Sequence, residues 1–139
     1  MSKVFAIYPL DKSSSTSFLN RIHTFETRML GDTWHCYKVH FSDDDHKRCI
    51  QQSMDSHFIF FMGHGGDTQL HGACAKYGEM PVDFTAIQEN KNFYEKEVFI
   101  DASNIDAFKG KIFFCFSCNS NKNNSKSLAR LSKNHGIKA

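Results

Sequence analysis

Residues 57–66 read HFIFFMGHGG and residues 111–120 read KIFFCFSCNS. The first stretch begins with His57–Met62, a run that is apolar almost throughout and predicts a strand buried on both faces of a sheet. The second begins with a further strand candidate, Lys111–Ser117. Both runs lead into glycine or small polar residues, and open α/β sheets gather their reactive groups beyond the carboxyl ends of the strands. The two stretches therefore predict an α/β sheet whose reactive residues lie beyond the carboxyl ends of these two strands.

Around these two runs, short apolar segments alternate with longer amphipathic ones. Strands are expected at Val4–Tyr8, Trp34–Phe41, His57–Met62 and Lys111–Ser117, and helices at Ser13–Leu30, from Asp43 onward, at Asn104–Lys109 and at Ser125–Asn134. Between residues 63 and 97, glycines indicate turns or a short hairpin. This order predicts an α/β domain in which helices cover both sides of a mostly parallel sheet.

The first expected helix carries the clearest helical pattern. Its apolar residues recur at intervals of four, three and four and form one stripe: Phe18, Ile22, Phe25 and Met29. Gly31 follows as the stop of this helix. The three aspartates at 43–45 favour the N-terminus of the second helix by their charge, and we expect them to lie in solvent.

Length and composition narrow the classes of function. The chain has 139 residues, of which 40% are hydrophobic and 23% charged, as in one globular domain. Its formal net charge of +2 provides no basic field for nucleic acid or anionic lipid. No apolar run has the length of a secretory signal core or a membrane span. Five cysteines at irregular spacing argue against a disulfide framework and favour a reducing cytoplasm.

His64 and Cys118 each follow one of the two quoted strand candidates. If these strands are adjacent and parallel, the imidazole and the thiol meet at one edge of the sheet. A histidine beside a cysteine can remove the thiol proton, after which the thiolate attacks a carbonyl and the imidazolium protonates the leaving amine. The glycines that flank His64 allow a substrate backbone to approach, and their amides can polarise a developing oxyanion.

The two stretches together resemble the caspase-like cysteine peptidases, a superfamily that includes caspases, metacaspases, clostripain, separase and the bacterial CHAT proteases. Its members share a hydrophobic strand that ends in His-Gly and a later hydrophobic strand that ends in the catalytic cysteine. Residues 116–120, FSCNS, are closer to the CHAT-like and metacaspase-like members than to caspases. Segments 104–111 and 127–131 also resemble the CHAT-like elements before and after the cysteine strand, so the likeness extends from Val4 to Ala139.

This resemblance implies a caspase-like three-layer α/β/α sandwich and a cysteine endopeptidase that cleaves protein substrates without a cofactor or metal. Residue by residue, it implies that His64 is the general base and acid and that Cys118 is the nucleophile. The backbone amides of Gly65 and Cys118 would form the oxyanion hole. The CHAT-like members further imply regulated proteolysis in a bacterial defence or stress response, in the cytoplasm and with neither a membrane nor a direct nucleic-acid partner.

Two features depart from the family pattern. Metacaspase-like members carry an aspartate two residues before the cysteine, where this chain has Phe116, so a preference for basic substrate residues is not supported. The family also continues after its last helix with another strand and a pocket-forming segment, whereas this sequence stops at Ala139. We therefore expect residues 1–139 to be the large-subunit portion of one caspase-like domain, which a second chain or a C-terminal half completes.

Three other interpretations remain open. The chain could be a catalytically inactive caspase-like scaffold, or a flavodoxin-like domain that binds a ligand at the same sheet edge. Although its spacing matches no established pattern, a zinc site would draw on His64, His71 and Cys74, with Cys118 as a fourth ligand. The remaining thiols are expected to be inert and packed inside the fold: Cys36, Cys49 and Cys115.

Overall fold

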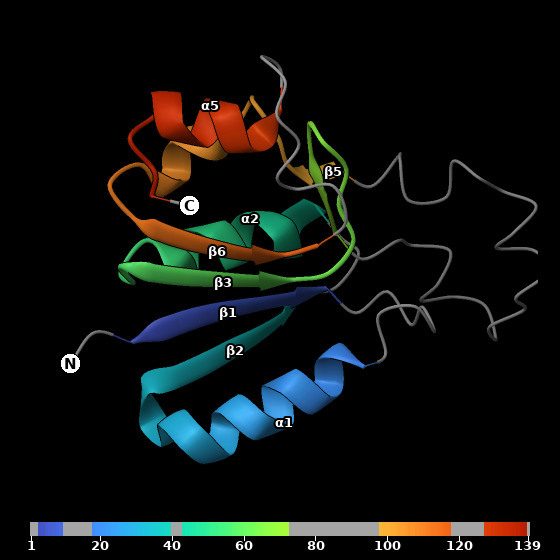
Figure 1. Cartoon of the computed structure of the whole chain (residues 1–139), viewed down its shortest axis with the longest axis vertical. Coiled ribbons are helices and arrows are strands. Elements are labelled where there is room, and N and C mark those ends of the chain that lie inside the picture. The colour runs from blue at the N-terminus through green and yellow to red at the C-terminus, as the bar shows by residue number, and fades with distance from the viewer. Residues whose placement is uncertain (1–2, 10–17, 40–42, 73–97, 118–126, 139) are drawn as a thin grey trace, which may run out of the picture.

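The computed structural model describes residues 3–9, 18–39, 43–72, 98–117 and 127–138 (Figure 1). Its centre is a four-stranded sheet in the order β2-β1-β3-β6, in which all three neighbouring pairs are parallel. The strands are β1 (Val4–Pro9), β2 (Trp34–Val39), β3 (Phe58–Met62) and β6 (Ile112–Phe116). All four strand predictions are confirmed over the described residues, with ends that differ by one residue; the predicted end of the second strand, residues 40–41, lies outside the described residues.

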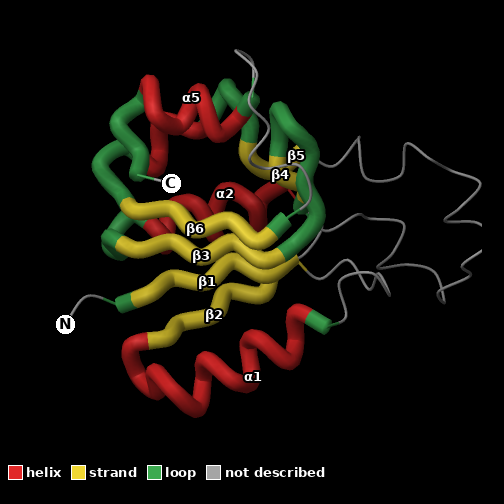
Figure 2. The backbone as a smooth tube through the Cα atoms, viewed as in Figure 1, coloured by secondary structure: helices red, strands yellow, loops and turns green. Residues whose placement is uncertain are grey.

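Helices cover both faces of this sheet (Figures 1 and 2). On one face lies α1 (Leu19–Leu30), which η1 (Gly31–Thr33) connects to β2. On the other face lie α2 (Asp43–Ser53), η2 (Ile105–Phe108) and α5 (Leu128–Asn134). The α/β class is therefore confirmed, and the layers are compatible with an α/β/α sandwich.

Alternation along the strands divides the apolar side chains between two cores, because successive residues point to opposite faces of a sheet. The larger core lies between the sheet and α2, η2 and α5, and its members include Phe5, Ile59, Phe61, Phe113, Cys49, Phe108 and Leu128. The smaller core lies under α1 and consists of Ala6, Leu19, Trp34 and Met62. Most of the buried apolar volume is thus on the α2 side.

The apolar stripe of the first helix coincides with its buried face only at Ile22. α1 buries Leu19 and half-buries Ile22, whereas Phe18, Phe25 and Met29 are exposed. The repeat of apolar residues identified the helix correctly. Which line of side chains turns toward the sheet was decided by how the helix packs on β1 and β2, and that contact joins residues distant in the sequence.

A smaller, two-stranded sheet follows β3 in the chain. β4 (Leu70–His71) pairs antiparallel with β5 (Val98–Ile100). The turn between β3 and β4 agrees with the hairpin expected after residue 63. The rest of that expectation falls on residues 73–97, which lie outside the described residues.

β6 is the last strand of the main sheet in the described chain, and residue 138 begins to pair along its outer side. The Phe113 N–H donates to the Lys138 carbonyl at 2.7 Å, and the Lys138 N–H donates to the Lys111 carbonyl at 3.0 Å. On the sheet face that carries α1, Phe114 and Phe116 remain exposed. None of the helices in the described segments combines the length and the apolar composition that a membrane span requires.

Candidate functional site

The carboxyl ends of β3 and β6 lie side by side, as expected for adjacent parallel strands. Met62 is opposite Phe116, and the Gly63 N–H donates to the Phe116 carbonyl at 3.3 Å. His64 follows Gly63 and is half-buried, while Ser117 continues the chain from β6. The structure therefore brings the segment after β3 against the segment after β6, although more than 50 residues separate them in the sequence.

Two of the glycines around His64 are required by close packing. A Cβ atom on Gly65 would lie 2.7 Å from Ser117 Oγ and 3.0 Å from Leu70 Cδ2. A Cβ atom on Gly63 would lie 3.1 Å from the Phe61 ring and 3.2 Å from Pro9 Cδ. A side chain at position 65 therefore requires Ser117 or the turn to move, whereas one at position 63 requires Phe61 or Pro9 to give by a few tenths of an ångström. Gly66 differs, because no atom lies within 4 Å of its hypothetical Cβ.

Cys118, the predicted nucleophile, lies outside the described residues. The residue before it, Ser117, is described, and its Oγ lies 3.1 Å from Cys115 Sγ. The backbone amides of Gly65 and Cys118, expected to form an oxyanion hole, are described only on the Gly65 side. The structure therefore places Gly65 and Ser117, the residues next to the predicted site, but not Cys118 itself.

The segment after β3 folds back as a hairpin on its own backbone. The Gly66 N–H donates to the Gln69 carbonyl at 2.8 Å, and the His71 N–H donates to the His64 carbonyl at 2.9 Å. Gly65 and Leu70 form an antiparallel bridge between these two bonds. This arrangement places His71 opposite His64 and fixes the backbone of the candidate base.

The hairpin is held from a second direction by α5. The backbone N–H of Leu128, the first residue of that helix, donates to the Asp67 carbonyl at 2.6 Å. Ser127 caps the same helix, since its hydroxyl oxygen accepts from the Arg130 N–H at 3.2 Å. The helix that follows β6 in the chain is thereby attached to the turn that follows β3.

His71 is the residue of this region that sequence reasoning underrated, since it was considered only as a zinc ligand. Its side chain is buried, at 8% exposure, and its Nε2 lies 3.0 Å from the side-chain amide nitrogen of Gln69. Burial, and then the charge of His64, lowers the pKa of His71 from 6.5 to about 4. A hairpin turn predicted at residues 66–69 would have indicated this role, because such a turn pairs residue 64 with residue 71.

The zinc interpretation is supported only in part by the positions of its ligands. His64 and His71 do lie together, but Cys74 and Cys118 fall outside the described residues. Among the residues that the structure describes, no group of three histidine, cysteine, aspartate or glutamate side chains is arranged to hold a metal ion.

A third histidine, His46 in the first turn of α2, packs nearby. Its ring lies 4.9 Å from the Phe99 ring of β5, and a Cβ atom on Gly72 would collide with it. His46 is buried. It is a packing contact between α2 and the small sheet, which the sequence did not predict because α2 and β4 are distant in the chain.

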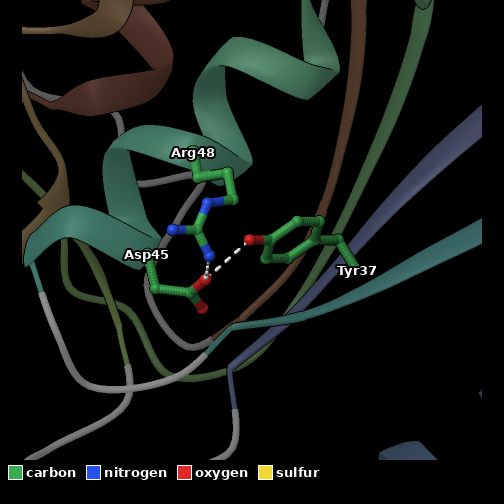
Figure 3. Close-up of polar contacts among 3 residues, drawn as sticks. All are labelled: Tyr37, Asp45 and Arg48. Atoms are coloured by element: carbon green, nitrogen blue, oxygen red, sulfur yellow. Dashed lines mark hydrogen bonds and ion pairs between the residues drawn. The ribbon is translucent and has the colours of Figure 1, made fainter.

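A polar cluster fastens the start of α2 to β2 (Figure 3). The Tyr37 hydroxyl donates to Asp45 Oδ1 at 2.6 Å, and Arg48 Nη1 lies 3.5 Å from the same oxygen. Burial, and then the hydrogen bond to Asp45, raises the pKa of Tyr37 to about 12. The expectation that the aspartates at 43–45 lie in solvent is therefore wrong for Asp45, which is 7% exposed. Its carboxylate is tolerated there because it is paired and hydrogen-bonded.

The three thiols expected to be inert lie inside elements of the fold. Cys49 is fully buried in α2, while Cys36 in β2 and Cys115 in β6 are half-buried against the two cores. Burial raises the pKa of Cys36 to about 11, and burial followed by the charge of Asp45 raises the pKa of Cys49. Since the thiolate is the reactive form, Cys36 and Cys49 are poor nucleophiles at neutral pH.

No protein-family model, no curated protein and no solved structure matches this chain.

Proposed function

We propose that this protein is a cysteine endopeptidase in which His64 and Cys118 form a catalytic dyad. The observation that carries the proposal is the parallel pairing of β3 with β6, in which Met62 is opposite Phe116. His64 is two residues beyond Met62, and Cys118 is two residues beyond Phe116. The register of the two strands thus supports the pairing of imidazole and thiol that the sequence predicts.

The proposed reaction divides peptide hydrolysis into two steps. His64 takes the proton from Cys118 Sγ, the thiolate attacks the scissile carbonyl carbon, and the amides of Gly65 and Cys118 donate to the resulting oxyanion. The His64 imidazolium then protonates the amine as the C–N bond breaks, which leaves a thioester on Cys118. In the second step His64 removes a proton from water, the hydroxide displaces the thiolate, and the acid product leaves.

The packing of Gly65 against Ser117 supports this arrangement of the oxyanion hole. Because no side chain fits between them, the backbone of the turn lies against the chain that leads to Cys118. The hairpin bond between His71 and His64 further holds the backbone of the proposed base. A site whose parts are fixed before substrate binds loses less free energy in orienting them.

The outer edge of β6 supports a second chain as a partner. Lys138 forms an isolated parallel bridge with Ile112, and the rings of Phe114 and Phe116 on the same strand are exposed. In the proposed enzyme, a second chain adds a strand along β6, covers these two rings and completes the substrate pocket. The purified chain is expected to co-elute with that second chain, and Phe114→Glu to elute alone, whereas Phe25→Glu on α1 still co-elutes. Co-elution of both variants, or of neither, would contradict this part of the proposal.

The substrate class is protein, cleaved within the chain, and the compartment is the reducing cytoplasm. The resemblance to CHAT-like proteases supports regulated proteolysis in a bacterial defence or stress response as the setting. Phe116, which replaces the aspartate of metacaspase-like members, has its ring exposed and in edge contact with Phe18 at 5.8 Å. An apolar group at this position argues against a basic substrate side chain beside it.

The test is site-resolved alkylation of the full chain by a peptidyl acyloxymethyl ketone, followed by mass spectrometry of the cysteine peptides. We expect selective labelling of Cys118, no labelling in Cys118→Ala, and a rate about 10²–10⁴-fold lower in His64→Ala. His57→Ala is the matched control, because His57 is an exposed histidine at the start of the same strand.

Two results would overturn the proposal. Labelling distributed evenly over the five cysteines, or absent from Cys118, would exclude an activated nucleophile. The chain would then be an inactive scaffold or a ligand-binding domain of the flavodoxin-like kind. Flavodoxin-like sheets have the same order of their first four strands as the sheet β2-β1-β3-β6, in which β6 is the fourth strand along the chain. Equal rates for His64→Ala and His57→Ala would exclude His64 as the base.

A further inference from the structure

The hairpin after β3 places two histidines on opposite strands of one turn. The His71 N–H donates to the His64 carbonyl at 2.9 Å, so the two residues are direct partners across the hairpin. Each imidazole can bind one proton, and two adjacent imidazolium ions repel each other. The proton that one histidine holds therefore affects the other.

The contact with Gln69 favours the neutral state of His71. The side-chain amide nitrogen of Gln69 lies 3.0 Å from His71 Nε2, and an amide nitrogen can only donate a hydrogen bond. With this nitrogen as the donor, His71 Nε2 is the acceptor, which corresponds to an uncharged ring that carries its proton on Nδ1. Burial of the His71 side chain favours the same state, because a buried imidazolium is poorly solvated.

Burial is the first influence on the pKa of His71, and the charge of His64 is the second; both act against protonation. From α2, His46 packs against Gly72, the residue next to His71. From β5, the residue paired with His71 is the apolar Val98. Asp67, in the same turn, has its carbonyl bonded to the Leu128 N–H of α5.

We propose that His71 is a positioning residue for the candidate base: it fixes the backbone of His64 and, kept neutral by Gln69, does not compete for the proton that His64 must hold. This inference rests on the proposed function, in which His64 takes a proton from the Cys118 thiol. If His71 bound that proton instead, the imidazolium of His64 would be disfavoured by repulsion, and fewer molecules would carry the reactive thiolate–imidazolium pair.

The first experiment measures histidine protonation directly, by NMR titration of the full chain in the Cys118→Ala variant. This background has no nucleophile, so the result does not depend on catalysis. On acidification we expect His64 to protonate first and His71 last, with the neutral His71 ring carrying its proton on Nδ1. Protonation of His71 before or together with His64, or a proton on Nε2 of the neutral ring, would overturn the inference.

The second experiment reverses the competition. Gln69→Glu replaces the amide donor with a carboxylate that accepts from His71 Nε2–H, so His71 is expected to protonate before His64. Thr68→Glu is the matched control, because Thr68 is exposed and places the same charge one residue away from the contact. In the chain that retains Cys118, Gln69→Glu should lower the alkylation rate near neutral pH about tenfold, and Thr68→Glu should leave it within about twofold.

The outcomes separate the two proposals. A reversed order of protonation with an unchanged alkylation rate would exclude a role for His71 in the reaction. Identical behaviour of Gln69→Glu and Thr68→Glu would exclude the specific contact. If instead His64→Ala leaves the alkylation of Cys118 unchanged, the dyad fails, and with it any role for His71 in that reaction, while the titration order still reports the pair itself.

Discussion

At the scale of single residues, burial controls the chemistry of the thiols. The pKa of Cys36 is raised from 9.0 to about 11 by burial, with Lys38 acting in the opposite direction. At neutral pH this corresponds to about 100-fold less thiolate than an unshifted thiol would carry. We expect iodoacetamide to modify Cys36 and Cys49 at least about tenfold more slowly in the folded chain than after denaturation in urea, as measured by peptide mass spectrometry. Equal rates in the two states would contradict this assignment.

The burial of His71 makes the stability of the fold depend on pH. Its pKa is about 4 in the folded chain against 6.5 for an unperturbed histidine. Between these values the unfolded chain binds a proton that the folded chain does not. The free energy of unfolding therefore falls as the pH drops from 6.5 toward 4, by at most about 3 kcal/mol, and the full contribution is present above 6.5.

His71→Asn should remove this pH dependence. The free energy of unfolding, measured with urea, falls between about pH 7 and about pH 4.5. We expect this fall to be about 2 kcal/mol smaller in His71→Asn than in the wild type. The control is His57→Asn, since His57 is exposed and its substitution should leave the difference unchanged. A wild-type difference retained in His71→Asn would show that other groups cause the acid sensitivity.

At the scale of elements, the two faces of the sheet differ in how completely they are covered. Phe61 of β3 is 0% exposed on the α2 side, whereas Phe114 of β6 is 55% exposed on the α1 side and stacks on Phe60, at 4.8 Å between ring centroids. Phe61→Ala should lower the free energy of unfolding by about 3–5 kcal/mol and Phe114→Ala by less than about 1 kcal/mol. Urea denaturation measures both, and similar losses would mean that the α1 side of β6 is covered in the isolated chain.

Lys111 links the end of α2 to the start of β6. Its buried Nζ donates to the Met54 carbonyl at 2.7 Å and also to the Ser56 carbonyl. Lys111→Met keeps the apolar stem but leaves both carbonyls without this donor, so a loss of about 1–3 kcal/mol is expected in thermal or urea unfolding. Lys109→Met, at an exposed position two residues earlier, should be close to neutral. Equal effects of the two substitutions would exclude this tie.

The elements also show where prediction from the sequence succeeds and fails. The runs at His57–Met62 and Lys111–Ser117 predicted strands correctly because a strand buried on both faces must be apolar at nearly every position. The spacing of apolar residues predicted the first helix correctly but not its buried face, since Phe25 and Met29 are exposed. A spacing of three or four residues does not tell which line of side chains packs on the sheet. The prediction that Asp45 lies in solvent was wrong for a similar reason, because Tyr37 and Asp45 come together only in the folded chain.

At the scale of the whole molecule, the candidate site depends on the close approach of two distant segments. Gly65→Ala would place a methyl group 2.7 Å from Ser117 Oγ, whereas Gly66→Ala meets no atom within 4 Å. We expect Gly65→Ala to cost about 1–3 kcal/mol of stability and to slow the alkylation of Cys118 by separating the two strand ends. Gly66→Ala should retain both properties. Alkylation rates that are equal in the two variants would contradict the role of this contact.

The helices and strands, and their order along the chain, follow from local patterns of residues. Alternating apolar runs and amphipathic stretches led to the parallel α/β sheet, and Gly-His-Gly-Gly after a buried strand marked the turn at which chemistry is proposed. These features are local, because strand and helix propensity and the stop at a glycine depend on residues near one another in the chain.

Only the tertiary structure decided which segments meet. It set β3 beside β6, paired His64 with His71 across a hairpin, and buried the side chain of His71 beside Gln69. In the folded chain Leu19 is on the buried face of α1, whereas Phe25 is exposed. The physical reason is the same in each case: burial and charge interactions depend on distances in space, and those distances exist only once residues far apart in the sequence have packed together.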